Sequence, residues 1–140
     1  MTRNVVVIAV SLLVACVDES GPPLVVSDVV IKRPIPGATV SAGYLELKNT
    51  SGQPITITGI ASPQFESVEI HETIIADGIA GMRPVAQLSI APGLSVRLEP
   101  GGKHLMLKQA DSEAETVTLQ LYSGSEMIIS LDAKFASPSN

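Results

Sequence analysis

A succession of short apolar segments, separated by turn-forming residues, constrains the fold of this chain more than any other feature. Isoleucine and threonine alternate along 54–60, and 40–47 ends in the alternating run Tyr44-Leu45-Glu46-Leu47. No segment sustains the period of an amphipathic helix, and turn signals recur about every 8–12 residues. We predict eight or nine strands, at 24–31, 40–47, 54–60, 65–75, 87–90, 94–98, 104–107, 116–122 and 127–135. This pattern indicates an all-β protein, an antiparallel Greek-key β-sandwich or barrel.

Composition limits both the core and the binding partners. At 140 residues, the chain has the length of one domain with a single core. Hydrophobic residues make up 45% of it, but aromatic residues only 3%, so the core is expected to be aliphatic. The net charge is −5 and basic residues do not cluster, which argues against nucleic acid as a partner because phosphate contacts dominate such binding.

The N-terminal segment has the pattern of an export signal. Arg3 precedes the ten-residue apolar run 5–14, which is too short to span a bilayer, and the run leads into Ala15-Cys16. This ending resembles the lipobox of bacterial lipoproteins, although an ordinary secretory signal is the alternative. We therefore expect a lipoprotein signal peptide at 1–15, lipidation of Cys16 with a membrane tether at 16–23, a domain at 24–135 and a polar tail at 136–140. The domain would be extracytoplasmic, in the periplasm or at the cell surface.

Two histidines and two methionines provide an uncommon set of metal donors. His71, Met82, His104 and Met106 follow the spacing H-x10-M-x21-H-x-M, and these histidines are the only two in the chain. Thioether sulfur is a soft, neutral donor that favours Cu(I), whereas imidazole binds many first-row metals. A His2Met2 set could hold one Cu(I) per chain in a roughly tetrahedral arrangement without anionic ligands. The alternative is a chance cluster, because methionine is usually core filler.

Strand periodicity supports the metal site. Successive side chains of a strand point to opposite faces, so inward Val68 and Ile70 would leave His71 on the other face. Inward Leu105 and Leu107 would likewise leave His104 and Met106 together on the face away from the core. The remaining donor, Met82, lies between Gly81 and Arg83-Pro84, where we predict a loop.

The four-donor motif and its surroundings resemble the periplasmic copper chaperone family PCuAC. The matching segments are Tyr44 with Asn49, 69–72 (EIHE), 82–85 (MRPV) and 100–107 (PGGKHLML). The resemblance covers about residues 24–135 and implies a cupredoxin-like fold that binds Cu(I) through His71, Met82, His104 and Met106. It also implies delivery of copper toward the Cu-A centre of cytochrome c oxidase, with subunit II and a Sco-type thiol protein as partners.

The sequence departs from the family pattern at three places. Glu72 stands where the family often has a second methionine, Lys103 where it often has an aromatic residue, and the tail lacks His and Met, so no second copper site is expected there. Glu69 could orient an imidazole or be a plain surface carboxylate. Arg83 could shield the ion, meet a partner carboxylate or be a solvated loop charge. We expect Met127 in the core, because it alternates with Ile129 and Leu131.

Other functions are less well supported by the residues. Blue copper electron transfer needs a cysteine thiolate, and Cys16 lies at the tether. A serine hydrolase would be expected to show G-x-S-x-G, and c-type haem attachment needs C-x-x-C-H; neither occurs. We therefore expect a metal carrier rather than an enzyme. The main alternative is a lipoprotein interaction module with an accidental His/Met cluster.

Overall fold

The computed structural model describes residues 21–110 and 114–136, which form eleven β-strands. Their bounds are β1 Leu24–Ile31, β2 Val40–Asn49, β3 Ile55–Ile57, β4 Gly59–Ala61, β5 Phe65–Ala76, β6 Ile79–Pro84, β7 Leu88–Ile90, β8 Ser95–Leu98, β9 Lys103–Ala110, β10 Thr116–Ser123 and β11 Glu126–Lys134. The described residues contain no helix, and therefore no helix long and apolar enough to cross a membrane. The predicted all-β class is confirmed.

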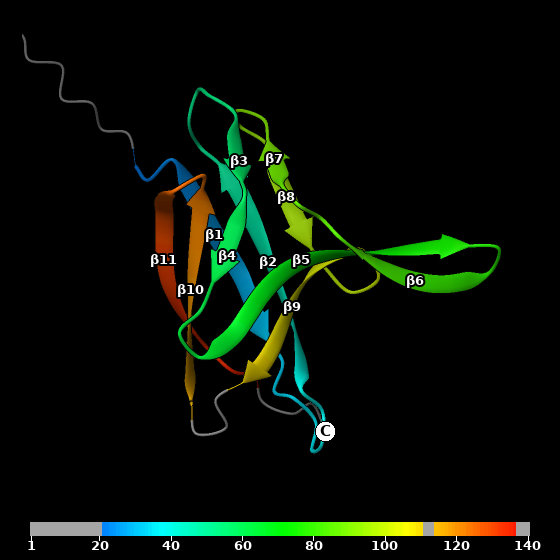
Figure 1. Ribbon diagram of the computed structural model, residues 1–140. Helices are drawn as coiled ribbons and strands as arrows, with labels where there is room; N and C mark the ends of the chain where they lie inside the picture. Colours follow the sequence, from blue (N-terminus) through cyan, green and yellow to red (C-terminus); the bar gives the residue numbers. More distant parts are fainter. Residues whose placement is uncertain (1–20, 111–113, 137–140) are drawn as a thin grey trace, which may run out of the picture.

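The main sheet curls into a nearly closed barrel (Figure 1). Its strand order is β1-β2-β9-β5-β4-β10-β11, with β6 added beside β5 and β8 beside β2, and every paired strand is antiparallel. Ile31 and Phe135 form an isolated parallel bridge that brings β1 near β11. Strands β3 and β7 form a separate two-stranded sheet.

The core inside the barrel is aliphatic, as the composition predicts. Every strand except β6 and β11 contributes at least one buried hydrophobic side chain, and Phe65 is the only aromatic one among the described residues. Val68 and Ile70 of β5 and Leu105 and Leu107 of β9 all belong to this core. The predicted inward faces of these two strands are therefore confirmed, and the opposite faces are free to carry polar or metal-binding side chains.

The distal part of β5, residues 73–76, and β6 project from the barrel as an arm (Figure 1). Its two-residue turn is Asp77-Gly78, with φ of 53° and 77°, as expected for the type I′ turn that Asp-Gly favours. Ile75 and Ile79 near the tip are 76% and 73% exposed. All six residues of β6 are exposed, so this arm adds surface but little to the core.

A buried asparagine joins the two sheets. Asn49, the last residue of β2, is fully buried, and its Nδ2 donates to the carbonyls of Gln53 at 2.7 Å and Ile90 at 2.9 Å. Its Oδ1 accepts from the backbone N–H and the hydroxyl of Ser51 at 2.9 and 2.7 Å. Because Ile90 ends β7, this side chain links the main sheet to the small β3–β7 sheet.

Candidate metal centre

The strand register brings all four predicted donors to one face of three adjacent strands. His71 of β5 lies directly across from His104 of β9, and Thr73, two residues further along β5, lies across from Met82 of β6. Met106 follows His104 at i+2 on β9. Cross-strand partners share a face, as do residues two apart. The four donors therefore lie on the face opposite the buried Ile70 and Leu105.

The two imidazoles are close enough to share an ion. Their ring centroids are 6.4 Å apart, with 43° between the ring planes. Two metal–nitrogen bonds of about 2.0 Å each, with the radii of both rings, span about 6 Å between centroids in a linear arrangement and about 5 Å at a tetrahedral angle. From their present 6.4 Å, the rings therefore need to approach by about 1 Å to bind one ion tetrahedrally. His104 is buried and the His71 side chain is 12% exposed, so this part of the centre is largely shielded from water.

The two methionines differ in their exposure to solvent. Met82, His104 and Met106 line a pocket of about 190 Å³, whose other wall is formed by Val40, Ser41 and Ala42 of β2. Met82 is 58% exposed, whereas Met106 is only partly exposed between β2 and β5. The predicted loop around Met82 was wrong, because residues 79–84 pair with β5 as strand β6. The outermost donor thus comes from the projecting arm.

Each imidazole is held through a different nitrogen. His71 Nε2 is 2.8 Å from Glu69 Oε2, and His104 Nδ1 is 3.1 Å from the carbonyl oxygen of Gly102. The opposite nitrogen of His71, Nδ1, is buried and has no hydrogen-bond partner among the described residues. An orphaned buried acceptor of this kind costs about 1–3 kcal/mol unless something else binds it. The donor set and this free nitrogen fit a metal ion.

Glu69 and Lys108 form the outer layer behind His71. Lys108 Nζ lies 3.1 and 3.2 Å from the two carboxylate oxygens of Glu69. The hydrogen bonds from His71 and then from Lys108 lower the pKa of Glu69 below its ordinary value. Of the two alternatives for Glu69, the structure favours contact with an imidazole over an isolated surface carboxylate.

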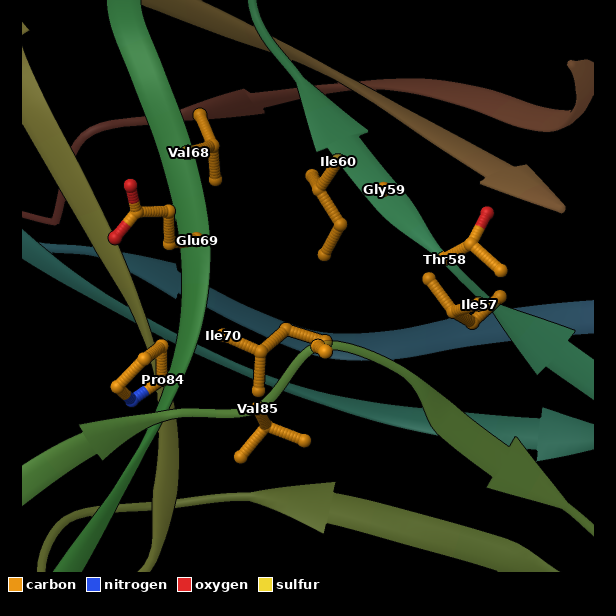
Figure 2. A pocket seen from close by; sticks show the side chains of 10 residues that line it. Ile57, Thr58, Gly59, Ile60, Val68, Glu69, Ile70, Pro84 and Val85 are labelled. Carbon is orange, nitrogen blue, oxygen red and sulfur yellow. The ribbon is translucent and has the colours of Figure 1, made fainter. Parts of the chain in front are cut away.

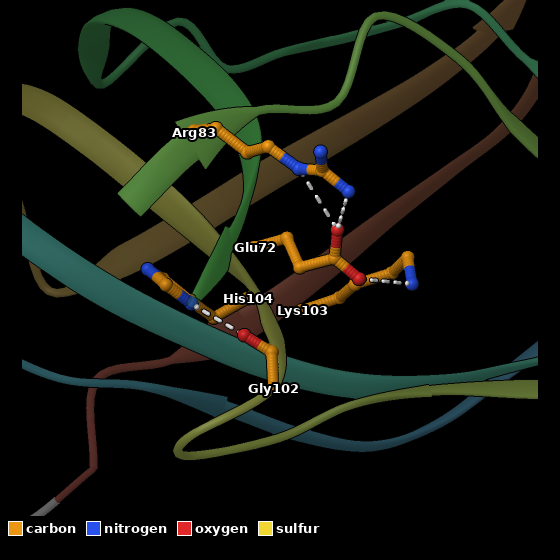
Figure 3. A network of polar contacts seen from close by, with 5 residues as sticks. All are labelled: Glu72, Arg83, Gly102, Lys103 and His104. Atoms are coloured by element: carbon orange, nitrogen blue, oxygen red, sulfur yellow. Dashed lines mark hydrogen bonds and ion pairs between the residues drawn. The ribbon is translucent and has the colours of Figure 1, made fainter. Parts of the chain in front are cut away.

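A second set of charged residues lies at the base of the arm, on the other face of β5 (Figure 3). Glu72 accepts from Arg83 Nη2 at 2.8 Å and Nε at 3.2 Å, and from Lys103 Nζ at 2.8 Å. These cations, Lys103 first, lower the pKa of Glu72. Arg83 therefore forms an ion pair with Glu72 of the same chain. Lys103, at the position where the PCuAC family often has an aromatic residue, is the second ion-pair partner of Glu72.

Two other hollows of the described surface are lined by neither histidine. One of about 200 Å³ lies between β4, β5 and Val85, with Glu69 at its margin (Figure 2). Another, of about 380 Å³, is lined by Tyr44, Arg97 and other residues of β1, β2 and β8. Within the described residues, no three His, Cys, Asp or Glu side chains gather to hold a metal. A metal centre here therefore depends on the thioethers.

The structure contradicts the predicted position of Met127 and does not describe Cys16. Met127 is 49% exposed, so its expected place in the core was wrong. The register of β10 and β11 shifts between Leu121↔Ile129 and Tyr122↔Met127, and this bulge breaks the alternation from which the core position was predicted. Cys16 and its expected lipidation lie outside the described residues, as does the signal peptide at 1–15.

Comparison with known proteins shows that the chain is similar to lipoproteins and to solved PCuAC domains. A family model described as "Putative lipoprotein LpqE-like" matches residues 24–132. "Putative lipoprotein Lxx21020" of Leifsonia xyli subsp. xyli is 28% identical over 110 residues, which cover 74% of this chain and 66% of that protein.

Solved structures show the same fold. The copper-bound PCuAC domain from PmoF2 is 21% identical, with a TM-score of 0.65 over 83% of this chain and 94% of that domain. The Cu(I) form of DR1885 from Deinococcus radiodurans is 28% identical, with a TM-score of 0.62 over 84% of this chain and 80% of that one. The resemblance to PCuAC domains is confirmed.

The fold and its face of histidine and methionine donors thus define the class: an antiparallel β-domain of the PCuAC type. Within that class, the chain belongs to the LpqE-like lipoprotein family, whose model covers most of the domain expected at 24–135.

Proposed function

We propose that this protein is a copper chaperone that carries one Cu(I) ion on His71, Met82, His104 and Met106. The observation that carries the proposal is the register of β6, β5 and β9, which aligns these four donors on one face. All four donors can be neutral, so they would hold a monovalent soft ion without the anionic ligands that a divalent ion prefers. The Cu(I) named in the DR1885 structure supports this choice of ion, and the copper-bound PmoF2 domain supports copper as the metal.

The arrangement fits a carrier better than a catalyst. Three donors are buried or partly buried and only Met82 is well exposed, so a partner's ligand could reach the ion from the side of the arm. We propose no enzymatic activity. The cellular role that follows is delivery of copper toward Cu-A assembly in cytochrome c oxidase, with subunit II and a Sco-type thiol protein as acceptors. An extracytoplasmic position, anchored through lipid on Cys16, agrees with the lipoprotein family.

A Cu(I) titration of the purified protein tests the function directly. Competition with a chromophoric Cu(I) chelator should give one ion per chain, and copper should raise the melting temperature because it binds the folded state. His71→Ala/His104→Ala should weaken binding at least about 100-fold, since it removes both imidazoles. Met127→Ala is the matched control, because this exposed methionine lies on β11. Full affinity in the double variant, or no thermal shift in the wild type, would favour a structural lipoprotein module instead.

A further inference from the structure

The two histidines differ in which nitrogen the protein holds, and this difference determines which nitrogen remains for an ion. A carbonyl oxygen can only accept, so His104 must donate Nδ1–H to Gly102 at 3.1 Å. A neutral imidazole carries one N–H, so the lone pair of His104 is then on Nε2. The backbone of the tight turn before β9 therefore fixes the tautomer of His104.

For His71 the order is reversed. Its Nε2 lies 2.8 Å from a carboxylate oxygen of Glu69, which can only accept when ionised. The proton is therefore on Nε2 and the lone pair on Nδ1, the buried nitrogen without a partner in the described structure. A buried lone pair without a donor, on a ring whose centroid lies 6.4 Å from that of His104, fits a metal-binding atom.

The carboxylate that holds His71 is itself held in place. Glu69 and His71 are two residues apart on one face of β5, and Lys108 of β9 contacts both oxygens of Glu69. Figure 2 shows the Glu69 carboxylate turned to the side of β5 away from Ile60 and Val85, so it points away from the apolar hollow that the residue helps to line. Its position is explained by contact with His71 and Lys108 rather than by packing.

We propose that Glu69, held by Lys108, is a positioning residue that makes Nδ1 the metal-binding atom of His71, while the Gly102 carbonyl makes Nε2 the metal-binding atom of His104. This inference rests on the proposed Cu(I) function and deepens it. A carboxylate behind a ligating imidazole fixes its ring orientation and raises its basicity, and loss of such a group typically costs 10–100-fold in metal affinity.

Imidazole ¹⁵N NMR of the full chain tests the tautomers before any metal is added. Long-range ¹H–¹⁵N correlation of the copper-free protein should show His71 protonated on Nε2 and His104 protonated on Nδ1. On addition of Cu(I) as its acetonitrile complex, the resonances of His71 Nδ1 and His104 Nε2 should shift, while the protonated nitrogens keep their protons. A copper-free His71 protonated on Nδ1, or Cu(I) bound at its Nε2, would overturn the inference while leaving the copper function intact. If Cu(I) perturbs neither ring, the proposed function itself fails.

Variants at Glu69 separate positioning from general structural support. Glu69→Ala should mix the two tautomers of His71 and weaken Cu(I) binding about 10–100-fold. Glu69→Gln, which keeps an oxygen acceptor, should restore the Nε2–H tautomer and most of the affinity. Glu66→Ala is the matched control, an exposed glutamate on the same strand, and should change affinity less than about twofold. Unchanged tautomer and affinity in Glu69→Ala, with the fold intact by circular dichroism, would contradict the proposal.

Discussion

At the scale of single residues, Gly43 shows how tightly the sheet behind the candidate metal centre is packed. It lies on β2 between Ile31 of β1 and Leu105 of β9, its register partners. A Cβ at this position would lie 2.9 Å from Ile31 Cδ1 and 3.2 Å from both Leu105 Cβ and Leu107 Cδ1. These separations are too short for ordinary packing, so glycine is needed here for space.

Gly43→Ala should therefore destabilise the fold by about 1–3 kcal/mol, the usual cost of overpacking a core. The free energy of unfolding, measured by urea denaturation, checks this. Gly52→Ala is the matched control, because a Cβ there meets nothing within 4 Å; it should stay within about 0.5 kcal/mol of the wild type. A Gly43→Ala variant as stable as the wild type would contradict the packing argument.

Single-residue predictions from sequence succeeded where strict alternation governs the side chain. Leu105 and Leu107 are buried, and the face of His104 and Met106 is the opposite one, as period-two alternation requires. The same rule failed at Met127, because a bulge cannot be read from alternation alone. The sequence left two alternatives for Glu69, contact with an imidazole or an isolated surface carboxylate. Their separation by two residues puts Glu69 and His71 on one face of a strand, but it does not determine where a long side chain points.

At the scale of elements, the arm depends at its base on the ion pairs of Glu72. The pKa of Glu72 is below its ordinary value of 4.5 in the folded protein, because Lys103 and Arg83 donate to its charged form. A depressed folded pKa stabilises the fold above the unfolded pKa. That stabilisation is lost as the pH falls through 4.5 toward the lower folded value.

Glu72→Gln should accordingly reduce the free energy of unfolding near pH 7, with the gap to the wild type narrowing as the pH falls below 4.5. Unfolding curves should be measured at a series of pH values for both proteins. Glu46 and Glu69 also have lowered pKa values, but both proteins contain them, so the difference in unfolding free energy reports Glu72 alone. Glu126→Gln, at the exposed start of β11, serves as the control. A gap between wild type and Glu72→Gln that does not change with pH would show that the ion pairs are not its cause.

Element boundaries were predictable where turn chemistry is explicit. Asp77-Gly78 forms the expected turn, and Pro100-Gly101-Gly102 separates β8 from β9 as expected. The segment 54–60 was predicted as one strand but forms β3 and β4, which pair with β7 and β10 respectively. Residues 79–84 were not predicted as a strand, because glycine and proline flank Met82 and its only pairing partner is the distal half of β5.

At the scale of the whole molecule, the buried side chain of Asn49 is the polar link between the two sheets. Asn49→Ala would leave the carbonyl of Ile90 and the backbone N–H of Ser51 without this partner. We expect a loss of about 2–4 kcal/mol in the free energy of unfolding, since buried groups left unsatisfied cost about 1–3 kcal/mol each. Gln53→Ala, which removes only an exposed neighbouring side chain, should cost less than about 0.5 kcal/mol. Equal unfolding midpoints for both variants would contradict the role of Asn49.

The overall architecture could be predicted only in part. The all-β class and aliphatic core follow from composition and alternation, which are local properties of the chain. The pairings β2–β9, β9–β5 and β4–β10 join segments far apart in sequence, and nothing in a single sequence specifies them. The family motif implied that the donors converge, and the register now supplies the physical route by which His71 meets His104.

The projecting β5–β6 arm makes part of the proposed metal centre exchangeable. Its distal residues contribute no buried side chain, so the barrel does not need their identity in order to fold. The arm nevertheless supplies one of the four donors, Met82. A redesigned hairpin with a harder or softer ligand at position 82 could thus change which metal ion is preferred, while the barrel and its core stay unchanged.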